Sequence, residues 1–356
     1  MSALEQQLQQ LTAAIQCSLN PSSLNQAAEA TTFLNNVKTS QSGWQYFLEL
    51  FTRCHPTHQQ DVAFVCVGSL CDVVRAVPFA SHSNSHPHHP NQNHTQHNQH
   101  ANATSPEKTL SSSLLPPPPP FLRPIREVLL RWFESNVTQG TLQYQPKFLK
   151  TKIALLYVLL LKTEYPHSWD NPFTFLFASL NVANQPRPLD SIDFFFRITK
   201  VMMEEVVAFD QSRHRDEIQR NVEVKQAMKR EHVVKRIVDV FVQVMRQHCT
   251  SSGSMDNNNT LPDGGSGNGT TGVASSNGQG VRLLSLCLRT MSEWIGWMDL
   301  NLVVQNIFLT PLFQCLGSPS LRIRIETVVC LRELVDKNMS SVARVSLLSK
   351  VGLVNV

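Results

Sequence analysis

The chain has 356 residues, of which 42% are hydrophobic and 16% charged, so it is long enough for two or three ordinary domains or one long repeat array. Its 31 basic and 27 acidic residues give a net charge of +4, which is too small for a histone-like nucleic-acid binder. The longest apolar run, 153–161, covers nine residues, whereas a membrane span needs about twenty. Residues 1–10 show no pattern of a secretory signal. The sequence therefore predicts neither membrane insertion nor secretion.

Apolar residues recur at helical spacing through most of the chain. At the start, the apolar residues step by three or four positions and form one stripe of a helix, made of Leu4, Leu8, Leu11, Ile15 and Leu19. After further helices up to residue 78, the periodicity predicts helices at about 121–135, 146–163, 170–182, 189–209, 216–248, 281–296, 301–316, 319–336 and 340–349. No segment alternates cleanly between apolar and polar residues, so we expect no strands.

Two segments lack this periodicity. Residues 81–120 hold seven of the thirteen histidines and end in the run Pro116–Pro120, which predicts a disordered insertion rich in His, Asn and Pro. Residues 250–280 are dominated by Gly, Ser, Asn and Thr, which predicts a flexible linker. The domains expected are therefore an N-terminal helical region at 1–80, a second helical domain at 121–249 and further helices at 281–356.

The predicted fold class is all-α. Helices joined by short polar turns, with a rhythm of about 40 to 50 residues, are typical of a solenoid built from HEAT-like repeats. The last helices keep apolar faces that nothing later in the sequence covers, although solenoids normally end in a polar cap. We therefore expect the front part of a longer array, incomplete at its C-terminus.

Catalytic signatures are missing from the sequence. No glycine is followed by lysine, so there is no phosphate-binding P-loop, and no G-x-S-x-G, H-E-x-x-H or C-x-x-C motif occurs. Residues 267–272 match G-x-G-x-x-G, but they lie in the predicted linker with no strand before them, which argues against a dinucleotide site. We expect no enzyme and no cofactor.

Cysteine and histidine raise the question of a metal site. Cys54, His55, His58, Cys66 and Cys71 lie close in sequence, but the last two fall on an apolar helix face and the spacing fits no zinc module. The favoured interpretation is buried thiols beside surface histidines, and a metal site is the alternative. All eight cysteines are expected to be mainly reduced rather than disulfide-bonded.

Positive charge is concentrated in the middle of the chain. Residues 121–250 carry 19 basic and 14 acidic groups, whereas 1–120 carry 4 and 6. On one continuous helix over 216–248, the cations Lys225, Lys229 and Arg236 would share a face opposite the apolar one. An ordinary solvated helix face and a binding surface for an anionic partner both fit this basic stripe. Lys147, Lys150 and Lys152 form a second, sparser group at a helix start.

The aromatic residues fit a core better than a surface that stacks on bases. Phenylalanines at 173, 175, 177 and 194–196 lie within apolar helical runs. Recognition of a folded RNA through its shape and phosphates would suit a basic solenoid better than the reading of single-stranded bases.

Five blocks of the sequence resemble a known family, in the order in which the family has them. Residues 162–169 (KTEYPHSW), with Phe173 and Phe177 after them, are similar to its T-E-Y-x-x-x-W-x-x-F-F block, and residues 192–199 (IDFFFRIT) to its D-x-x-L-R-I-L stretch. Residues 220–231 (RNVEVKQAMKRE) resemble R-R-N-x-x-I-K-D-x-M-R-E, and residues 294–302 (WIGWMDLNL) resemble Y-V-S-W-I-D-L-N-L. Residues 321–339 resemble the helix that follows, with Asn338 where glycine is common.

These blocks resemble the N-terminal portion of exportin-T, the nuclear export receptors for transfer RNA (tRNA) within the importin-β, or karyopherin, superfamily. The resemblance implies a HEAT-repeat superhelix that binds mature tRNA and Ran-GTP together, passes the nuclear pore by contact with pore proteins and shuttles between nucleus and cytoplasm. It implies no small-molecule substrate, because the nucleotide belongs to Ran. Ran would contact the first repeats, with the helices at about 57–78 as candidates.

The candidates for RNA or Ran contact form one group of basic side chains, namely Lys225, Lys229, Arg236, Arg220, Lys147 and Lys150. No metal ligands are predicted. The alternative function is that of another karyopherin, or a HEAT scaffold, with protein cargo.

Overall fold

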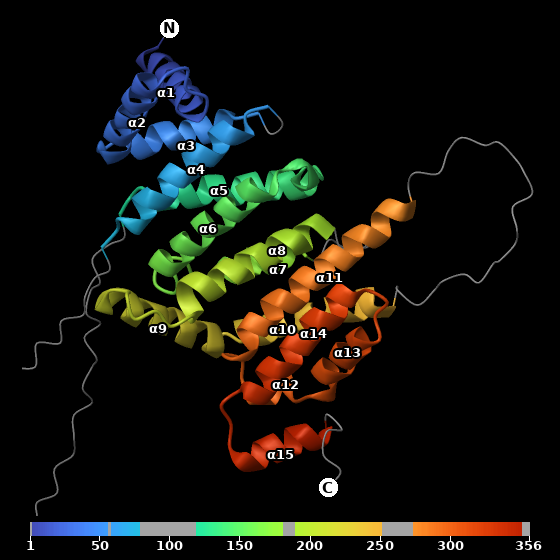
Figure 1. Cartoon of the computed structure of the whole chain (residues 1–356). Coiled ribbons are helices and arrows are strands. Elements are labelled where there is room, and N and C mark those ends of the chain that lie inside the picture. Colours follow the sequence, from blue (N-terminus) through green and yellow to red (C-terminus); the bar gives the residue numbers. More distant parts are fainter. Residues whose placement is uncertain (1, 56–57, 79–118, 181–188, 251–272, 351–356) are drawn as a thin grey trace, which may run out of the picture.

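The computed structural model describes residues 2–55, 58–78, 119–180, 189–250 and 273–350. Within these ranges the chain forms fifteen α-helices, one short 3-10 helix and one π-helical turn, with no strand (Figure 1). The prediction of an all-α fold is therefore confirmed. No helix in the described ranges is long and apolar enough to cross a membrane. The predicted insertion at 81–120 lies outside the described residues except for its last two positions, and so does most of the linker at 250–280.

The first four helices pack against one another at the N-terminal end. They are α1 (Ala3–Leu19), α2 (Leu24–Thr39), α3 (Gly43–Arg53) and α4 (Gln60–Arg75). The side chains of Ser2 and Ser23 accept hydrogen bonds from backbone N–H groups in the first turns of α1 and α2, which fixes where these helices begin. Of the predicted stripe on α1, Leu8, Leu11 and Ile15 are buried, because α3 and α4 cover them.

The rest of the chain continues as pairs of helices. The remaining helices are α5 (Leu122–Thr138), α6 (Lys147–Glu164), α7 (Pro172–Ala178), α8 (Leu189–Met202), α9 (Arg215–Arg230), α10 (Val233–Thr250), α11 (Val273–Ile295), α12 (Leu300–Val303), α13 (Asn306–Leu316), α14 (Leu321–Asp336) and α15 (Ser341–Lys350). A π-helical turn, η2 (Met203–Val207), extends α8.

The helix pairs form two layers. One layer, called the front layer here, contains α4, α6, α8, α11 and α14, each packed on the next, and these helices run in the same direction (Figure 1). Of the helices that precede them, α3, α5, α10 and α13 each pack against the front-layer helix that follows in sequence. Helices α6 and α8 begin 42 residues apart, at Lys147 and Leu189. This arrangement is the HEAT-like α-solenoid that the sequence predicts.

Aromatic side chains fill the space between the layers. Phe194, Phe195 and Phe196 of α8 are all buried, and Phe196 stacks on Phe241 of α10 with ring centroids 5.6 Å apart. The indole N–H of Trp294 in α11 donates to the backbone oxygen of Thr199 at 3.1 Å. The phenylalanines therefore belong to the core, as expected, and each buried ring contributes about 1.5–3 kcal/mol through removal from water.

Three predicted helix boundaries were wrong. The helix expected at 216–248 is broken between α9 and α10, where His232 adopts a left-handed conformation with φ 56°. The helix expected at 301–316 is two helices, α12 and α13, because Gln305 is extended and begins a new helix. Helix α11 begins at Val273 rather than 281, so it starts inside the segment expected as linker.

Candidate nucleic-acid interface on the front layer

Ion pairs cross the exposed face of the front layer from helix to helix. Lys200 of α8 lies 3.7 Å from Glu293 of α11, and Arg289 of α11 lies 4.0 Å from Glu326 of α14. These side chains are partly exposed, so each pair contributes only about 0–1 kcal/mol. They show which turns of neighbouring helices lie side by side.

A tighter cluster joins α6 to α8. The carboxylate of Asp193 lies 3.1 Å from the Lys150 ammonium and accepts a hydrogen bond from Arg197 Nε at 2.8 Å. Burial alone would raise the pKa of Asp193, but the hydrogen bonds and charges of Arg197 and Lys150 outweigh it and lower this pKa below its ordinary value. Lys150 is only 5% exposed. This candidate for RNA or Ran contact therefore serves inside the fold, where it neutralises Asp193.

Three exposed cations lie along one edge of the front layer. Thr151 accepts a hydrogen bond from Arg197, so Lys147 lies level with the first turns of α8. The pairs of Lys200 with Glu293 and of Arg289 with Glu326 likewise place Arg282 level with the starts of α8 and α14, within about one turn of the level of Arg322. We call Lys147, Arg282 and Arg322 the basic edge. All three are exposed.

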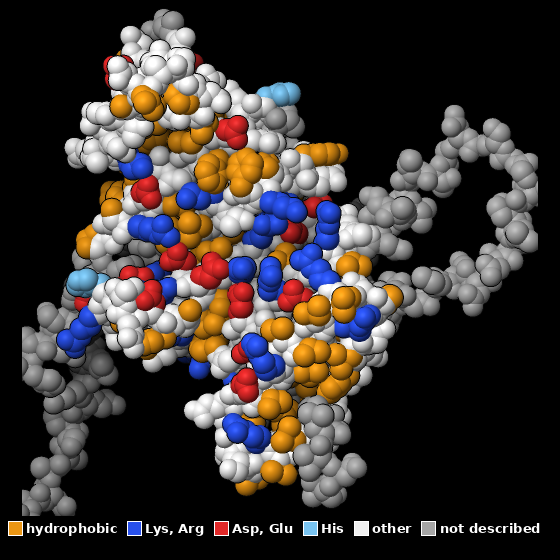
Figure 2. All heavy atoms as spheres, viewed as in Figure 1, with side chains coloured by type: hydrophobic (Ala, Val, Ile, Leu, Met, Phe, Trp, Pro, Cys, Tyr) orange, Lys and Arg blue, Asp and Glu red, His pale blue; other side chains and the backbone are white. Residues whose placement is uncertain are grey.

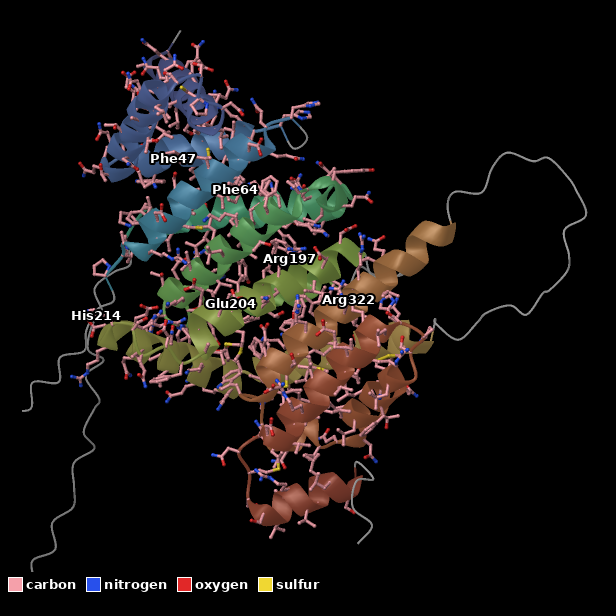
Figure 3. All side chains as sticks on the ribbon, in the orientation of Figure 1. Phe47, Phe64, Arg197, Glu204, His214 and Arg322 are labelled. Atoms are coloured by element: carbon pink, nitrogen blue, oxygen red, sulfur yellow. A yellow bond between two sulfur atoms is a disulfide. The ribbon has the colours of Figure 1, made fainter. Side chains whose placement is uncertain are left out.

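No ion pair involves the basic edge within the described residues. Helices in such a layer lie about 8–10 Å apart, so the basic edge is roughly 25–30 Å long from α6 to α14. Basic groups gather over this part of the front face (Figure 2), and Arg322 lies on the same face as Arg197 and Glu204 (Figure 3). The N-terminal ends of α6, α8 and α14 also lie along this edge and add partial positive charge. The acidic groups on the same turns are Asp190 and Asp193 of α8 and Glu326 of α14; Asp193 is paired with Lys150 and Arg197, and Glu326 with Arg289.

The predicted basic stripe does not lie on one helix face. Lys225 and Lys229 belong to α9 and Arg236 belongs to α10, and the helix break at His232 separates them. The Lys229 ammonium lies over the Trp297 ring at 5.3 Å from its centroid, and the Arg236 guanidinium lies over the Phe177 ring at 3.9 Å. Both residues are exposed, while Lys225 is half-buried. Burial, together with Lys229 and Arg213, lowers the pKa of Lys225.

Arg220 holds helices together. Its guanidinium donates to the backbone oxygens of Lys162, Thr163 and Tyr165 at 2.8–2.9 Å and to the carboxylate of Glu223 at 3.0 Å. The first three acceptors lie at the C-terminal end of α6, where helix carbonyls lack partners within the helix. The side chain is 10% exposed. Arg220 therefore fastens α9 to the end of α6 rather than facing a partner.

The cysteines differ from the prediction in one respect. Cys249, at the end of α10, and Cys315, in the last turn of α13, form a disulfide, with Cα atoms 5.6 Å apart. The prediction of reduced thiols is wrong for this pair, because α10 packs against α13 and brings together residues 66 positions apart. The other six are free thiols.

The described residues contain no group of side chains suited to bind a metal ion. Within the part of the chain that the structure describes, no cluster of three or more His, Cys, Asp or Glu could hold a metal ion. Burial raises the pKa of Cys66, and that of Cys71 to about 12, which opposes the thiolate form that binds zinc. The histidines between 82 and 100 lie outside the described residues.

Sequence comparison decides the family. A sequence profile described as exportin 1-like protein matches residues 146–331, which span α6 to most of α14. The chain belongs to the exportin 1-like family. The matched range contains α6, α8, α11 and most of α14 from the front layer, and all three residues of the basic edge.

Similar proteins of this family carry the name exportin-T. The chain is 27% identical to exportin-T of Dictyostelium discoideum over 232 residues, which cover 65% of this chain and 18% of that relative. It is 26% identical to exportin-T of Homo sapiens over 225 residues (63% and 19%). The match to exportin-T of Aspergillus oryzae, at 23% identity, extends over 317 residues (87% and 24%). The exportin 1-like chain thus spans about a fifth of the length of the relatives it matches.

Proposed function

We propose that the chain acts as a nuclear export receptor for tRNA. It would bind mature tRNA through its shape and phosphates, cooperatively with Ran-GTP. The observation that carries the proposal is its similarity to exportin-T from amoeba, animals and fungi over 60% or more of its length. The receptor would shuttle between nucleus and cytoplasm through contacts with pore proteins. It would act as a carrier rather than an enzyme, without a cofactor or a small-molecule substrate.

The basic edge is the surface proposed for RNA. Lys147, Arg282 and Arg322 are exposed and have no carboxylate partner within the described ranges, so phosphates can approach them at little desolvation cost. A row of cations roughly 25–30 Å long suits the backbone of a folded RNA, because phosphate contacts read shape and position rather than base sequence. Lys225, Lys229 and Arg236 remain weaker candidates, and Lys150 and Arg220 are replaced by this edge because the fold buries them.

Ran-GTP is proposed to contact the N-terminal helices, with α4 and the residues before it, about 57–78, as the candidate surface. Helix α4 is the first helix of the front layer, so a partner bound there would lie on the same face as RNA bound to the basic edge (Figure 1). Two ligands that select the same arrangement of helices raise each other's affinity by the same factor. Cooperative loading would follow from this linkage.

A binding experiment tests the proposal. Gel shifts compare folded tRNA with unstructured RNA of equal length, each with and without Ran-GTP. We expect tighter binding of the folded tRNA and a further gain with Ran-GTP. Equal binding of both RNAs, unaffected by Ran-GTP, would contradict the tRNA-export function. Ran-GTP binding without any RNA preference would instead favour the alternative, a karyopherin or HEAT scaffold with protein cargo.

A further inference from the structure

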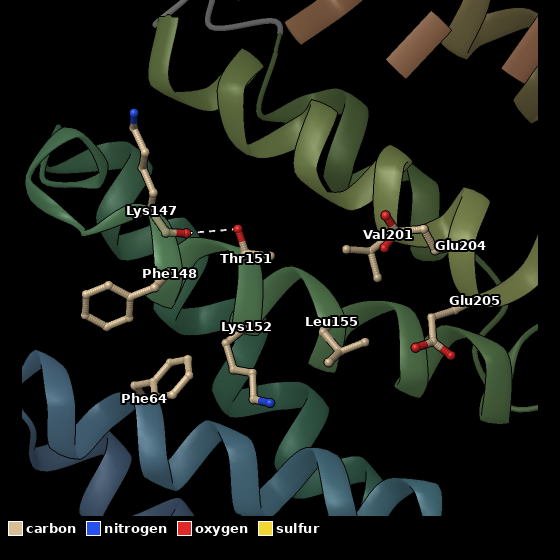
Figure 4. A pocket seen from close by; sticks show the side chains of 9 residues that line it. All are labelled: Phe64, Lys147, Phe148, Thr151, Lys152, Leu155, Val201, Glu204 and Glu205. Atoms are coloured by element: carbon tan, nitrogen blue, oxygen red, sulfur yellow. Dashed lines mark hydrogen bonds between the residues drawn. The ribbon is translucent and has the colours of Figure 1, made fainter. Parts of the chain in front are cut away.

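A groove opens between α4, α6 and the end of α8. It has a volume of about 560 Å³ and is lined by side chains from all three helices and from η2 (Figure 4). This volume is within the range of sites that hold a few side chains of a partner. Along α6 the groove extends from Phe148 to Leu155, which corresponds to roughly 10 Å of helix. It can therefore receive about three residues of an extended chain or two turns of a helix.

The floor of the groove is apolar. The rings of Phe64 and Phe148 meet edge to face with centroids 5.3 Å apart, and Leu155 and Val201 continue the apolar surface toward α8 (Figure 4). Phe148 is 45% exposed, although the residues that follow it along α6 are mostly buried. Covering exposed apolar surface is favourable by about 25 cal/mol per Å², so the floor favours a large apolar side chain.

The charged side chains of the groove differ along its length. At one end, Glu205 already lies 2.7 Å from Arg75 and 3.9 Å from Lys162, and Glu204 lies 3.7 Å from Lys200. Along the middle, Lys152 points toward α4 and forms no ion pair with any described residue, whereas the Lys147 ammonium points away from the phenylalanines (Figure 4). The unneutralised charge of the groove is therefore positive and lies beside the phenylalanines.

Lys152 is held in place beside the apolar floor. Its ammonium lies over the Phe64 ring, 5.6 Å from the centroid. Gly68 of α4 leaves room for this side chain, since a Cβ at that position would lie 3.3 Å from Lys152 Cε. The glycine thus lets a cation lie along α4 at the edge of the groove, where a carboxylate can reach it.

We propose that this groove docks a short segment of a partner protein that carries one or two large apolar side chains followed closely by carboxylates. The apolar side chains contact Phe64, Phe148 and Leu155, and a carboxylate pairs with Lys152. A phosphate backbone fits less well, because the apolar floor gives it no partner and Glu204 and Glu205 would repel it. Phe64 lies within 57–78, the range proposed for Ran-GTP, so the groove and the Ran surface share part of α4, and the test is made without Ran.

Selection from a random library of 12-residue displayed peptides, with the full chain immobilised, tests the proposal in the absence of RNA and Ran. We expect enriched peptides to share a large apolar residue near Asp or Glu. The best of them, made with a fluorescein label, is then measured by fluorescence anisotropy. Phe148→Ser and Lys152→Glu should each weaken its binding at least tenfold, the size of a typical interface hot spot. Replacing the peptide's acidic residues by lysine should restore binding to Lys152→Glu.

Matched exposed positions serve as controls. Tyr144→Ser removes an aromatic ring that is 64% exposed outside the groove, and Lys235→Glu reverses an exposed charge on α10. Both should bind the peptide like the unchanged chain, and thermal unfolding verifies that all variants are folded. Enrichment of peptides without this pattern, or binding unaffected by the groove variants, would overturn the proposal. The proposal would also be overturned if Phe148→Ser and Lys152→Glu weakened tRNA binding equally strongly, since the groove would then be an RNA site.

Discussion

Two regions rich in cations use their charge in opposite ways. Where α6, η2 and α9 meet, Arg220 donates to three backbone oxygens, and Arg213 donates to the backbone oxygens of Glu204 and Glu205. Lys162 at this joint is paired with Glu217. Along the basic edge, by contrast, Lys147, Arg282 and Arg322 are exposed without a carboxylate partner in the described ranges. The difference shows that a local count of basic residues does not reveal a binding surface. Some of these side chains donate hydrogen bonds to carbonyl oxygens at nearby helix ends and are no longer available to a partner.

The largest effect is expected from breaking the joint at Arg220. Arg220→Ala should lower the free energy of unfolding by about 3 kcal/mol, because three carbonyl oxygens lose a charged donor and Glu223 keeps only His167 beside it. Arg220→Lys should recover little of this loss, since a single ammonium cannot donate in the forked geometry of a guanidinium. Chemical denaturation followed by circular dichroism measures both variants.

Arg230 provides a control on the same helix. Its side chain is 69% exposed and lies 3.8 Å from Glu231, so Arg230→Ala should change the free energy of unfolding by less than about 0.5 kcal/mol. Similar losses for Arg220→Ala and Arg230→Ala would show that the joint does not depend on the capping hydrogen bonds.

The stripe residues sharpen the comparison on RNA binding. Changing Lys225, Lys229 and Arg236 together to Ala should lower the slope of log affinity against log salt by no more than about 0.9, the value for one lost phosphate contact. The reason is that the break at His232 prevents the three from facing one phosphate backbone as a single row. A fall of the slope by about 2.7, the value for three lost phosphate contacts, would show that α9 and α10 form the main RNA surface.

The smallest effect concerns pH. Because the folded structure lowers the pKa of Asp193 below its ordinary value of 3.8, its ion pairs add stability above that pH, and this stability is lost as the pH falls through the lower, folded-state pKa. In Asp193→Asn this pH-dependent part, on the order of 1 kcal/mol, should be missing. The free energy of unfolding, measured between pH 2 and pH 6, tests this. An equally steep decrease toward low pH in both proteins would assign the pH dependence to other carboxylates.

Periodicity was sufficient to predict the fold class. The stripe on α1 and the apolar runs of α6 and α8 repeat at helical spacing, and packing against neighbouring helices buries them as that spacing requires. The break between α9 and α10 could not be predicted in this way, because no glycine or proline marks it and His232 adopts its positive φ between two amphipathic helices. The pairing of Cys249 with Cys315 likewise depends on how α10 packs against α13.

The candidate site was predictable only in part. Lys147 was named from its position at a helix start, but Arg282 and Arg322 were missed, because they lie 40 residues apart and are aligned only through the register of α8, α11 and α14. Lys150 and Arg220 were chosen for their charge. Sequence alone could not show that Asp193 and the carbonyl oxygens at the end of α6 surround them. The basic edge could have been found by aligning the predicted front-layer helices with one another as repeats and comparing the residues at their starts.

The central claim is that the basic edge contacts the phosphates of folded tRNA. The most direct test compares the salt dependence of tRNA binding, with Ran-GTP present, for the unchanged chain and for the variant with Lys147, Arg282 and Arg322 all changed to Ala. Each lost phosphate contact should reduce the log–log slope by about 0.9, so we predict a fall of one to three such steps, with thermal stability nearly unchanged. An identical slope and affinity in the two proteins would contradict the claim.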